Sequence, residues 1–335
     1  MRNKVVFKTL FLTDTHHTMN NPSNRLDNCF ETTLEKIEEV KNIVKEENID
    51  VVLHGGDFFN SPNISDNVAS IIGKAYMDFT APIYVIPGNH DTIGNNITTL
   101  PQTKLGLLGE LGVINILNRT DKLKFEREGV SIQITGAPSD FGINMDKEMF
   151  IVREKETDIA IHMVHAMLLK EDAKFGSYMP LTEIQNITKA DITLSGDFHL
   201  GFDPVVNDGK LFVNPGALVR KYNFIEEMAR KPKIVIISVY DDKTYSYELR
   251  ELETAKAGEV VLDRTKLEEK MDYLDRLDDF KNSIISSNNK NYSIDVKDII
   301  KMISTQENID NEVTKLAIEK IDLARIQLNG NDDLS

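Results

Sequence analysis

Five short apolar segments of this chain each end in polar side chains that can bind a metal ion. The segments span residues 5–12, 51–53, 83–86, 159–164 and 192–194. The motifs that follow them are, in the same order, Asp14-Thr15-His16, Gly55-Gly56-Asp57, Gly88-Asn89-His90-Asp91, His165 and Gly196-Asp197-Phe198-His199. All seven histidines lie inside these motifs or within three residues of one. Carboxylate, imidazole and amide groups at strand ends favour a site for hard or borderline divalent cations.

The order of the expected elements predicts a layered α/β domain. Apolar residues spaced three or four apart predict helices over 29–47 and 65–79, which alternate with the first three strands. Six strands are expected further on, at 113–117, 122–127, 130–135, 158–164, 192–194 and 210–213. We therefore expect a four-layer α-β-β-α sandwich, with two sheets face to face and the functional groups on loops at one edge.

The C-terminal part of the chain predicts two smaller regions. A hairpin with strands 234–240 and 245–252 is expected to form a small α+β cap, and charged helices are expected over 266–286, 296–303 and 309–328. The expected boundaries are 1–230 for the catalytic domain, 231–264 for the cap and 265–335 for the helical region. The narrow apolar stripe of the last helix fits either a local helical subdomain or a surface that binds a partner helix.

Net charge and cysteine content limit the class of protein. The formal charge of −15 argues against a protein that coats nucleic acid or anionic membrane by itself, but it does not exclude an enzyme that cleaves phosphodiesters. No apolar run reaches the roughly 18 residues of a membrane span, and the N-terminal segment has no signal-peptide pattern. The single cysteine, Cys29, excludes an internal disulfide and is expected to be buried rather than reactive. We expect a cytoplasmic protein that does not bind membranes.

The spacing of the motifs suggests two metal ions that share one carboxylate, as in many enzymes that cleave phosphate esters. Asp57 suits the shared position, because the double glycine before it lets the backbone turn closely beneath the metals. We expect the remaining ligands to be Asp14, His16 and His199 at the first metal and Asn89, His165 and Asp197 at the second. Mixed oxygen and nitrogen ligands favour manganese, iron or zinc over calcium.

His90 and Asp91 are candidates for the chemistry itself. His90 follows Asn89 directly, so it is expected to contact the phosphate or protonate the leaving oxygen rather than share that metal. Asp91 is expected to orient the imidazole of His90. Water would be the nucleophile of an in-line attack on phosphorus.

This ordered set of motifs resembles the calcineurin-like metallophosphoesterases over residues 5–220. The resemblance implies a first metal held by Asp14, His16, Asp57 and His199, a second held by Asp57, Asn89, His165 and Asp197, and a phosphate contact from His90. Within that superfamily the chain is similar to the SbcD-type DNA-repair nucleases, through Gly56–Pro62, Asn214–Arg220 and the expected cap with helices after it. This likeness implies a manganese-dependent nuclease, usually dimeric, bound to an SbcC-type SMC-like ATPase. The length is nearer the compact phage-encoded versions.

The sequence departs from the family pattern at two positions. The family's Gly-His-x-His is Gly196-Asp197-Phe198-His199 here. An aspartate can still bind a metal, but its charge changes the expected metal preference. Asn60 stands where some relatives carry a histidine thought to guide the DNA strand, which leaves the polarity of an exonuclease open.

Several polar residues near the motifs have two possible roles. His165 is favoured over His162 as a ligand because it ends the strand. His54 either bonds to a ligand or is an ordinary strand residue, and His17 either touches phosphate or faces solvent. Arg220 either reaches a phosphate or supports the Pro215-Gly216 turn. The basic residues Arg220, Lys221, Arg230, Lys231 and Lys233 either track a DNA backbone or form a solvated surface.

Three functions are consistent with these residues. The leading one is a dinuclear-metal DNA nuclease that acts with a coiled-coil ATPase, which would bind the C-terminal helices at about 295–328. The second is a phosphatase or small nucleotide phosphodiesterase with the same core. An open groove would favour the nuclease and a closed pocket the small-substrate enzyme. The third, a non-catalytic scaffold, is disfavoured because Asp57 and His90 are both present.

Overall fold

The computed structural model describes residues 3–170 and 176–265 continuously, and single residues or short groups between 267 and 320. The chain divides into two compact units, residues 1–264 and 265–335. The helices expected over 266–286, 296–303 and 309–328 lie almost entirely outside the described residues, and with them the expected partner-binding region at 295–328. Those expectations therefore stay predictions.

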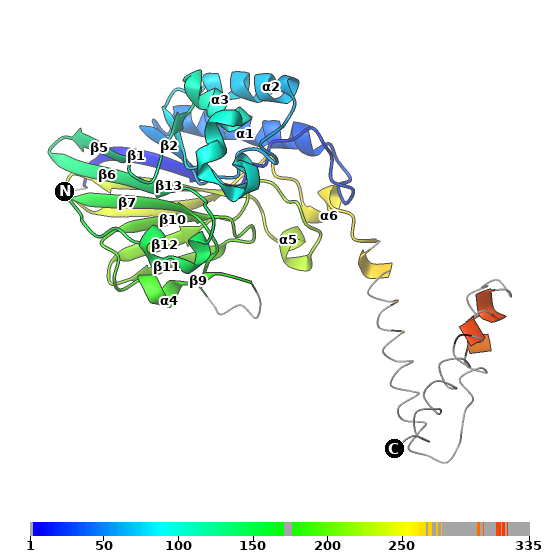
Figure 1. The fold of residues 1–335 in the computed structure, drawn as a ribbon. Helices are drawn as coiled ribbons and strands as arrows, with labels where there is room; N and C mark the ends of the chain where they lie inside the picture. Colours follow the sequence, from blue (N-terminus) through cyan, green and yellow to red (C-terminus); the bar gives the residue numbers. More distant parts are fainter. Residues whose placement is uncertain are drawn as a thin grey trace, which may run out of the picture. The chain divides into compact units, whose positions relative to one another are not determined.

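Two six-stranded mixed sheets form the centre of the first unit (Figure 1). The first sheet has the order β14-β13-β1-β2-β3-β4, from β1 (Val5–Leu12), β2 (Val51–His54), β3 (Ile83–Val85), β4 (Asn115–Ile116), β13 (Lys233–Tyr240) and β14 (Tyr245–Glu251). The second has the order β11-β12-β10-β7-β6-β5, from β5 (Lys122–Arg127), β6 (Val130–Ala137), β7 (Ile159–His165), β10 (Ile192–Gly196), β11 (Phe202–Asn207) and β12 (Lys210–Asn214). Strands β1 to β4 run parallel, and so do β6, β7, β10 and β12.

Helices cover the outer faces of both sheets, so the predicted four-layer α/β sandwich is confirmed. The helices α1 (Cys29–Glu46), α2 (Asp66–Met77) and α3 (Lys104–Glu110) lie over the first sheet, and α4 (Leu181–Ile184) lies on the side of the second (Figure 1). One apolar core fills the space between α1–α3 and the first sheet, and a second lies between the sheets. A third packs the short helices η4 (Ile143–Met145) and η5 (Lys147–Met149) and α4 on the second sheet.

Strand β1 shows why the sheets pack face to face. Phe7 and Phe11 point into the core between the sheets, whereas Leu10 and Leu12 point into the core beneath the helices. Successive side chains of a strand point to opposite faces, so β1, which has large apolar residues at the consecutive positions 10–12, must be covered on both sides. Each fully buried side chain of this size contributes about 1.5–3 kcal/mol to folding.

Helix α1 follows from its local sequence. The Asn28 side chain caps its N-terminus by accepting hydrogen bonds from the backbone N–H groups of Phe30 and Glu31. The buried positions Phe30, Ile37, Val40 and Val44 lie three, four or seven residues apart and face the first sheet. Cys29 is buried at the start of this helix, as expected.

The expected cap at 231–264 is wrong, although its two strands exist. Strand β13 pairs antiparallel with β1 and places the hairpin β13–β14 inside the first sheet. Ile234 and Ile236 enter one core while Val235 and Ile237 enter the other. An unbroken apolar run of this kind is typical of a strand covered on both faces, not of a peripheral hairpin. Helix α6 (Gly258–Val261) and the bridge between Leu262 and Arg25 then return the chain to the N-terminal loop.

Several short elements were not expected from the sequence, because they are too short to show a period. They are η1 (Asn89–Asp91), η2 (Ile93–Asn95), η3 (Ile97–Gln102), η4, η5, β8 (Leu168–Leu169), β9 (Met179–Pro180), β11, α3, α4, α5 (Ile225–Ala229) and α6. Within the described part of the chain, no helix has both the length and the apolar character needed to cross a bilayer.

Candidate dinuclear metal centre

The candidate ligands come from loops at the carboxyl ends of five parallel strands, β1, β2, β3, β7 and β10. The loops are bonded to one another. The N–H of Asp14 donates to the Gly56 carbonyl at 3.0 Å, and the N–H of His16 donates to the Asp57 carbonyl at 2.9 Å. His165 and Gly196 are direct neighbours in the second sheet. Because carboxyl ends of parallel strands meet at one edge, motifs far apart in sequence converge there.

Four of the candidate ligands adopt a backbone conformation that side chains rarely take. Asp14, His16, Asp57 and Asp197 have φ values of 54°, 42°, 49° and 74°. A non-glycine residue in this left-handed region costs of order 1–3 kcal/mol and persists only where the surroundings enforce it. The bent backbone turns these four side chains toward a common point.

Two glycines allow the loops to approach closely. Gly56 has a φ of 100°, and a Cβ atom there would lie 2.3 Å from His165 Nδ1. A Cβ atom at Gly88 would lie 2.2 Å from Asp57 Oδ1. Any larger residue at either position would therefore displace a candidate ligand.

The first cluster consists of Asp14, His16, Asp57 and His199, whose ligand atoms all lie within 4.8 Å of one another. His16 Nε2 lies 3.0 Å from His199 Nε2 and 3.4 Å from Asp57 Oδ2. His199 Nε2 lies 3.5 Å from Asp14 Oδ1, a fully buried atom to which no group among the described residues donates a hydrogen bond. A buried carboxylate oxygen without a donor is costly unless a cation compensates it.

The electrostatics of this cluster favour the ligand forms of its side chains. Burial and the neighbouring His199 hold the pKa of His16 well below 6.5, so the imidazole is neutral and keeps a lone pair. Burial acts against the ionised form of Asp14, but the adjacent His199 and the charge of His165 outweigh it and lower its pKa to about 2. A neutral imidazole beside ionised carboxylates is a typical donor set for a divalent cation.

The second cluster is centred on His165. Its Nδ1 lies 2.6 Å from the Gly55 carbonyl and donates to it, so Nε2 is the nitrogen that would bind a metal. Burial lowers the pKa of His165, but the charges of Asp57, Asp14 and Asp197 outweigh it and raise this pKa well above 6.5, so metal binding would release the proton from Nε2. That Nε2 lies 3.2 Å from Asn89 Oδ1, 3.4 Å from Asp57 Oδ1 and 4.0 Å from Asp197 Oδ1. Asp57 thus presents Oδ2 to the first cluster and Oδ1 to the second, which is the arrangement of a bridging ligand. The two clusters together present seven side chains, and this set fits two divalent cations.

His90 lies at the mouth of the two clusters, with 38% of its side chain exposed. Its backbone N–H donates to Asp57 Oδ1 at 2.9 Å, and its Nδ1 donates to the Asn60 carbonyl at 2.8 Å. Its Nε2 lies 4.0 Å from Asp57 Oδ2 and is directed toward the site. Asn60 therefore contributes through its backbone, and that contact would remain with another residue at this position.

Asp91 does not orient the imidazole of His90, contrary to our expectation. Its buried carboxylate accepts hydrogen bonds from the backbone N–H groups of Phe58, Phe59 and Gly88, at 3.1, 2.9 and 2.9 Å. It therefore joins the loop after β2, which carries Asp57, to the loop after β3, which carries Asn89. Burial and the nearby Asp57 raise the pKa of Asp91 to about 7, against the effect of these donors.

The other predicted histidines lie behind the centre. His54 is fully buried and contacts Thr15 Oγ1 at 3.0 Å and the N–H of Gly56 at 3.2 Å, so it supports two ligand loops without touching a ligand side chain. His17 neither touches phosphate nor faces solvent, because it is buried against the Tyr76 hydroxyl at 3.0 Å. His162 packs between Thr135 and Met149, away from the clusters.

Arg220 cannot reach a phosphate, and most of the predicted basic surface is occupied elsewhere. Arg220 is 2% exposed and donates to the backbone carbonyls of Arg230 and Lys256. Arg230 donates to Glu227 and to two backbone carbonyls, while Lys231 and Lys233 lie near Glu251. Lys221 is the member of the group that faces the centre, with Nζ 3.4 Å from His16 Nδ1.

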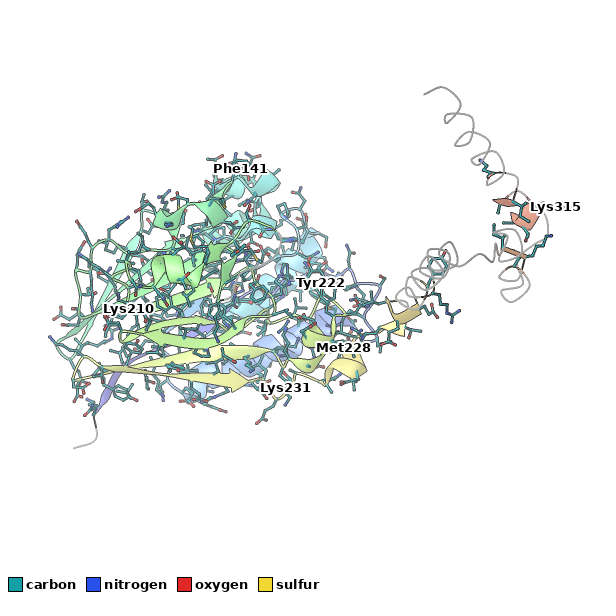
Figure 2. All side chains as sticks on the ribbon, turned by 90° about the horizontal axis from the view of Figure 1, so that it is seen from below. Phe141, Lys210, Tyr222, Met228, Lys231 and Lys315 are labelled. Atoms are coloured by element: carbon teal, nitrogen blue, oxygen red, sulfur yellow. The ribbon has the colours of Figure 1, made fainter. Side chains whose placement is uncertain are left out.

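Sequence reasoning missed Tyr222, whose ring centroid lies 5.6 Å from that of His199. Tyr222, which is labelled in Figure 2, lies in the loop between β12 and α5. The pattern Lys221-Tyr222-Asn223-Phe224, with aromatic residues two apart after a basic residue, was the available signal. Ring contacts with a histidine distant in sequence cannot be read from such a pattern.

Fold and site together are those of the metallophosphoesterase class. The chain belongs to the calcineurin-like phosphoesterase family, which it matches over residues 7–201. Two solved structures with the same fold are GAP50, the anchor in the inner membrane complex of Plasmodium, and a dimetal phosphatase from Danio rerio. The first has a TM-score of 0.51 and 12% identity, covering 76% of this chain and 87% of that one. The second has a TM-score of 0.50 and 8% identity, covering 74% and 97%.

A curated relative is similar over a shorter segment. The DNA double-strand break repair protein Mre11 of Saccharolobus solfataricus is 36% identical over 83 residues, which are 24% of this chain and 21% of that protein. The chain thus matches about a fifth of the length of this relative. At 8% and 12% identity, the two structures above concern the fold alone.

Proposed function

We propose that the protein is a DNA nuclease of the SbcD type, which hydrolyses phosphodiesters at two divalent metal ions. The observation that carries this proposal is the accessible mouth of the centre. His90 is more than a third exposed, and an open cavity of about 480 Å³ borders Asn89 and Asp197. A DNA strand needs such access, because each of its phosphates is flanked by nucleotides on both sides. The segment similar to Mre11, a repair protein by its name, supports the same substrate.

The metal ligands, Asp57 and His90 have different roles in such a reaction. The two clusters would hold divalent ions, which would supply positive charge at the phosphoryl oxygens and lower the pKa of water. Asp57 fixes the spacing between the clusters through its two oxygens. In its protonated form His90 presents Nε2–H to the mouth while Nδ1–H stays on the Asn60 carbonyl, so it can donate to a phosphoryl or leaving oxygen. We propose Mn²⁺ as the native ion, because nitrogen and oxygen ligands are mixed.

A coiled-coil partner completes the proposal. We propose that the protein is a homodimer in the cytoplasm and binds an SbcC-type SMC-like ATPase through residues 295–328. Deletion of residues 291–335 should abolish the complex and leave two Mn²⁺ ions per chain, measured by size-exclusion chromatography and calorimetry. A complex that survives the deletion would refute this site of attachment.

The function is tested by incubating the purified full chain and Mn²⁺ with an end-labelled DNA duplex and a single-stranded circle, beside His90→Ala. A small phosphodiester is assayed in parallel. We expect the wild type to cleave DNA and the variant to lose at least about 100-fold in rate, because a positioned acid contributes 10²–10⁴-fold. Cleavage of the circle would show endonuclease activity.

A small-substrate phosphatase or phosphodiesterase is the second candidate. The cavity beside Asn89 and Asp197 has the size of a small-ligand pocket, which favours this alternative. Hydrolysis of the small ester with intact DNA, even after addition of the ATPase, would establish it. A non-catalytic scaffold would hydrolyse neither substrate.

A further inference from the structure

Two aromatic rings are exposed beside the first metal cluster. Tyr222 is 46% exposed and Phe224 is 51% exposed. Their centroids lie 5.7 Å apart at an interplanar angle of 24°, which is a stacked arrangement. Tyr222 is also inclined by 32° to the ring of the candidate ligand His199, at 5.6 Å. The three rings thus form a short series that leads from the metal centre to the surface; we call Tyr222 and Phe224 the aromatic pair.

The backbone that carries the aromatic pair is held in place. Asn24 donates to the Lys221 carbonyl at 2.9 Å, and the Asn223 side chain donates to the Asp263 carbonyl at 2.9 Å. Arg264 donates to the Asn223 carbonyl. The positions of the rings are therefore fixed before any ligand binds, which lowers the entropy cost of stacking on them.

The surroundings indicate what the aromatic pair binds. A molecule that stacks on Tyr222 would lie next to the first cluster, which contains His16 and His199. Lys221, which approaches His16, adds positive charge at the same edge. A nucleobase is the part of a phosphodiester chain that has a π-face and lies within one nucleotide of the phosphate. Aromatic rings beside a cationic groove are how proteins hold single strands without reading their sequence.

We propose that the aromatic pair stacks an unpaired nucleobase adjacent to the scissile phosphate, on the side of the first metal cluster. The inference rests on the proposed nuclease function and adds to it a preference for DNA that is single-stranded at this point. Tyr222 contacts the base through the part of its ring that neither His199 nor Phe224 covers, and Phe224 stacks on Tyr222 and holds its ring in place.

The first test measures cleavage of a single-stranded oligonucleotide by the full chain with Mn²⁺. Loss of one base–aromatic stack should raise KM about tenfold in Tyr222→Ala. Tyr222→Phe should stay near the wild type because it keeps the ring. Tyr247→Ala is the matched control, since Tyr247 is 39% exposed on β14. Mn²⁺ titration should give equal affinities for all four proteins. A Tyr222→Ala variant with unchanged KM would overturn the proposal.

The second test locates the base by a double-mutant cycle. One abasic residue is moved along the oligonucleotide. At one position beside the cleaved bond, the abasic residue should raise the KM of the wild type about tenfold and leave the KM of Tyr222→Ala almost unchanged. If the abasic residue and the Tyr222→Ala substitution act independently at every position, so that their effects on KM multiply, stacking is contradicted. Tyr222 would then serve packing or contact another partner.

A binding measurement separates this inference from the proposed function. The fluorescence of a 2-aminopurine base in the oligonucleotide is followed as the protein is added with Ca²⁺ in place of Mn²⁺. Quenching that is retained in Tyr222→Phe and lost in Tyr222→Ala supports stacking whether or not DNA is cut. Absence of cleavage with normal quenching would count against the nuclease alone, and binding without Tyr222-dependent quenching against the aromatic pair alone.

Discussion

At the level of single residues, His165 and His162 show how orientation separates a ligand from a packed residue. Both are buried on β7, three positions apart. His165 directs Nε2 to Asn89, Asp57 and Asp197, whereas His162 uses both nitrogens for Thr135 and the Met149 carbonyl. The sequence favoured His165 because it ends the strand, and its role as a ligand stays a prediction.

These two histidines form a matched pair for mutagenesis. We expect His165→Ala to bind one Mn²⁺ per chain instead of two and to lose about 100-fold or more in activity. His162→Ala should bind two and keep most of its activity, but unfold about 1–3 kcal/mol more easily because its buried partners lose their hydrogen bonds. Calorimetric titration and urea unfolding measure both effects. Two ions bound by His165→Ala would refute its role as a ligand.

Asp91 is another residue whose role follows from its hydrogen-bond partners. Three backbone N–H groups point at its two oxygens, so the site requires a group that only accepts. We expect Asp91→Asn to destabilise the protein by about 1–3 kcal/mol, because its NH₂ group would face an N–H donor. Activity should fall as well, since Asn89 and His90 would shift. Urea unfolding of the metal-free proteins measures the loss, and equal midpoints would contradict this account.

At the level of elements, residues 217–220 connect the ligand loops. The N–H of Ala217 donates to the His199 carbonyl at 2.9 Å. The N–H groups of Leu218 and Val219 donate to the carbonyls of Thr13 and Asp14, at 3.0 and 3.5 Å. The four carbonyls of residues 217–220 accept from cationic side chains: Arg230 bonds to residues 217 and 219, Lys36 to 218 and Arg25 to 220. The apparent basic surface is thus partly an internal scaffold for the site.

Lys36 makes this scaffold sensitive to pH. Burial, together with Arg25, lowers its pKa to about 7, although the nearby Cys29 acts in the opposite direction and Arg220 and Arg230 add to the lowering. In the unfolded chain the lysine stays charged up to about pH 10.5. The unfolded state therefore binds more protons between pH 7 and pH 10.5, and this group makes the folded state more stable as the pH rises through that window.

Replacement of Lys36 tests that sign. We expect Lys36→Met to be more stable than the wild type by about 1–3 kcal/mol at pH 7 and below, with the difference shrinking toward pH 10. Lys45→Met on the exposed side of the same helix is the control and should show no such trend. Urea unfolding of the metal-free protein at a series of pH values provides the data. A constant difference from pH 6 to pH 10 would disprove the buried charge.

The elements also show what sequence can and cannot predict. The strands that carry ligands and helix α1 were predictable, because their periods are clear and each motif directly follows an apolar run. The place of β13 was not, since a hairpin signal does not say which strand it pairs with. The positions of Arg220, His17 and Asp91 also depended on contacts with groups distant in the sequence, which no local pattern encodes.

At the level of the whole molecule, the negative charge is in part concentrated at the centre. Asp14, Asp57 and Asp91 are buried within one edge of the two sheets, and Asp197 lies beside them. In a chain of net charge −15 there is little positive potential to offset them from outside. Bound cations are thus expected to contribute to the stability of the fold as well as to the chemistry.

Metal binding should therefore raise the unfolding temperature of the full chain. A ligand that binds only the folded state stabilises it by RT ln(1 + [L]/Kd), or about 2.7 kcal/mol at one hundred times Kd. For a domain of this size we expect a rise of about 5–10 °C in Mn²⁺ relative to EDTA. Asp57→Asn should lose most of this rise because Asp57 serves both clusters, whereas His162→Ala should retain it from a lower starting temperature. Differential scanning calorimetry with Mn²⁺, Ca²⁺ and EDTA decides the matter. A smaller rise in Ca²⁺ would agree with the imidazole ligands, and identical transitions in Mn²⁺ and EDTA would rule out the metal centre.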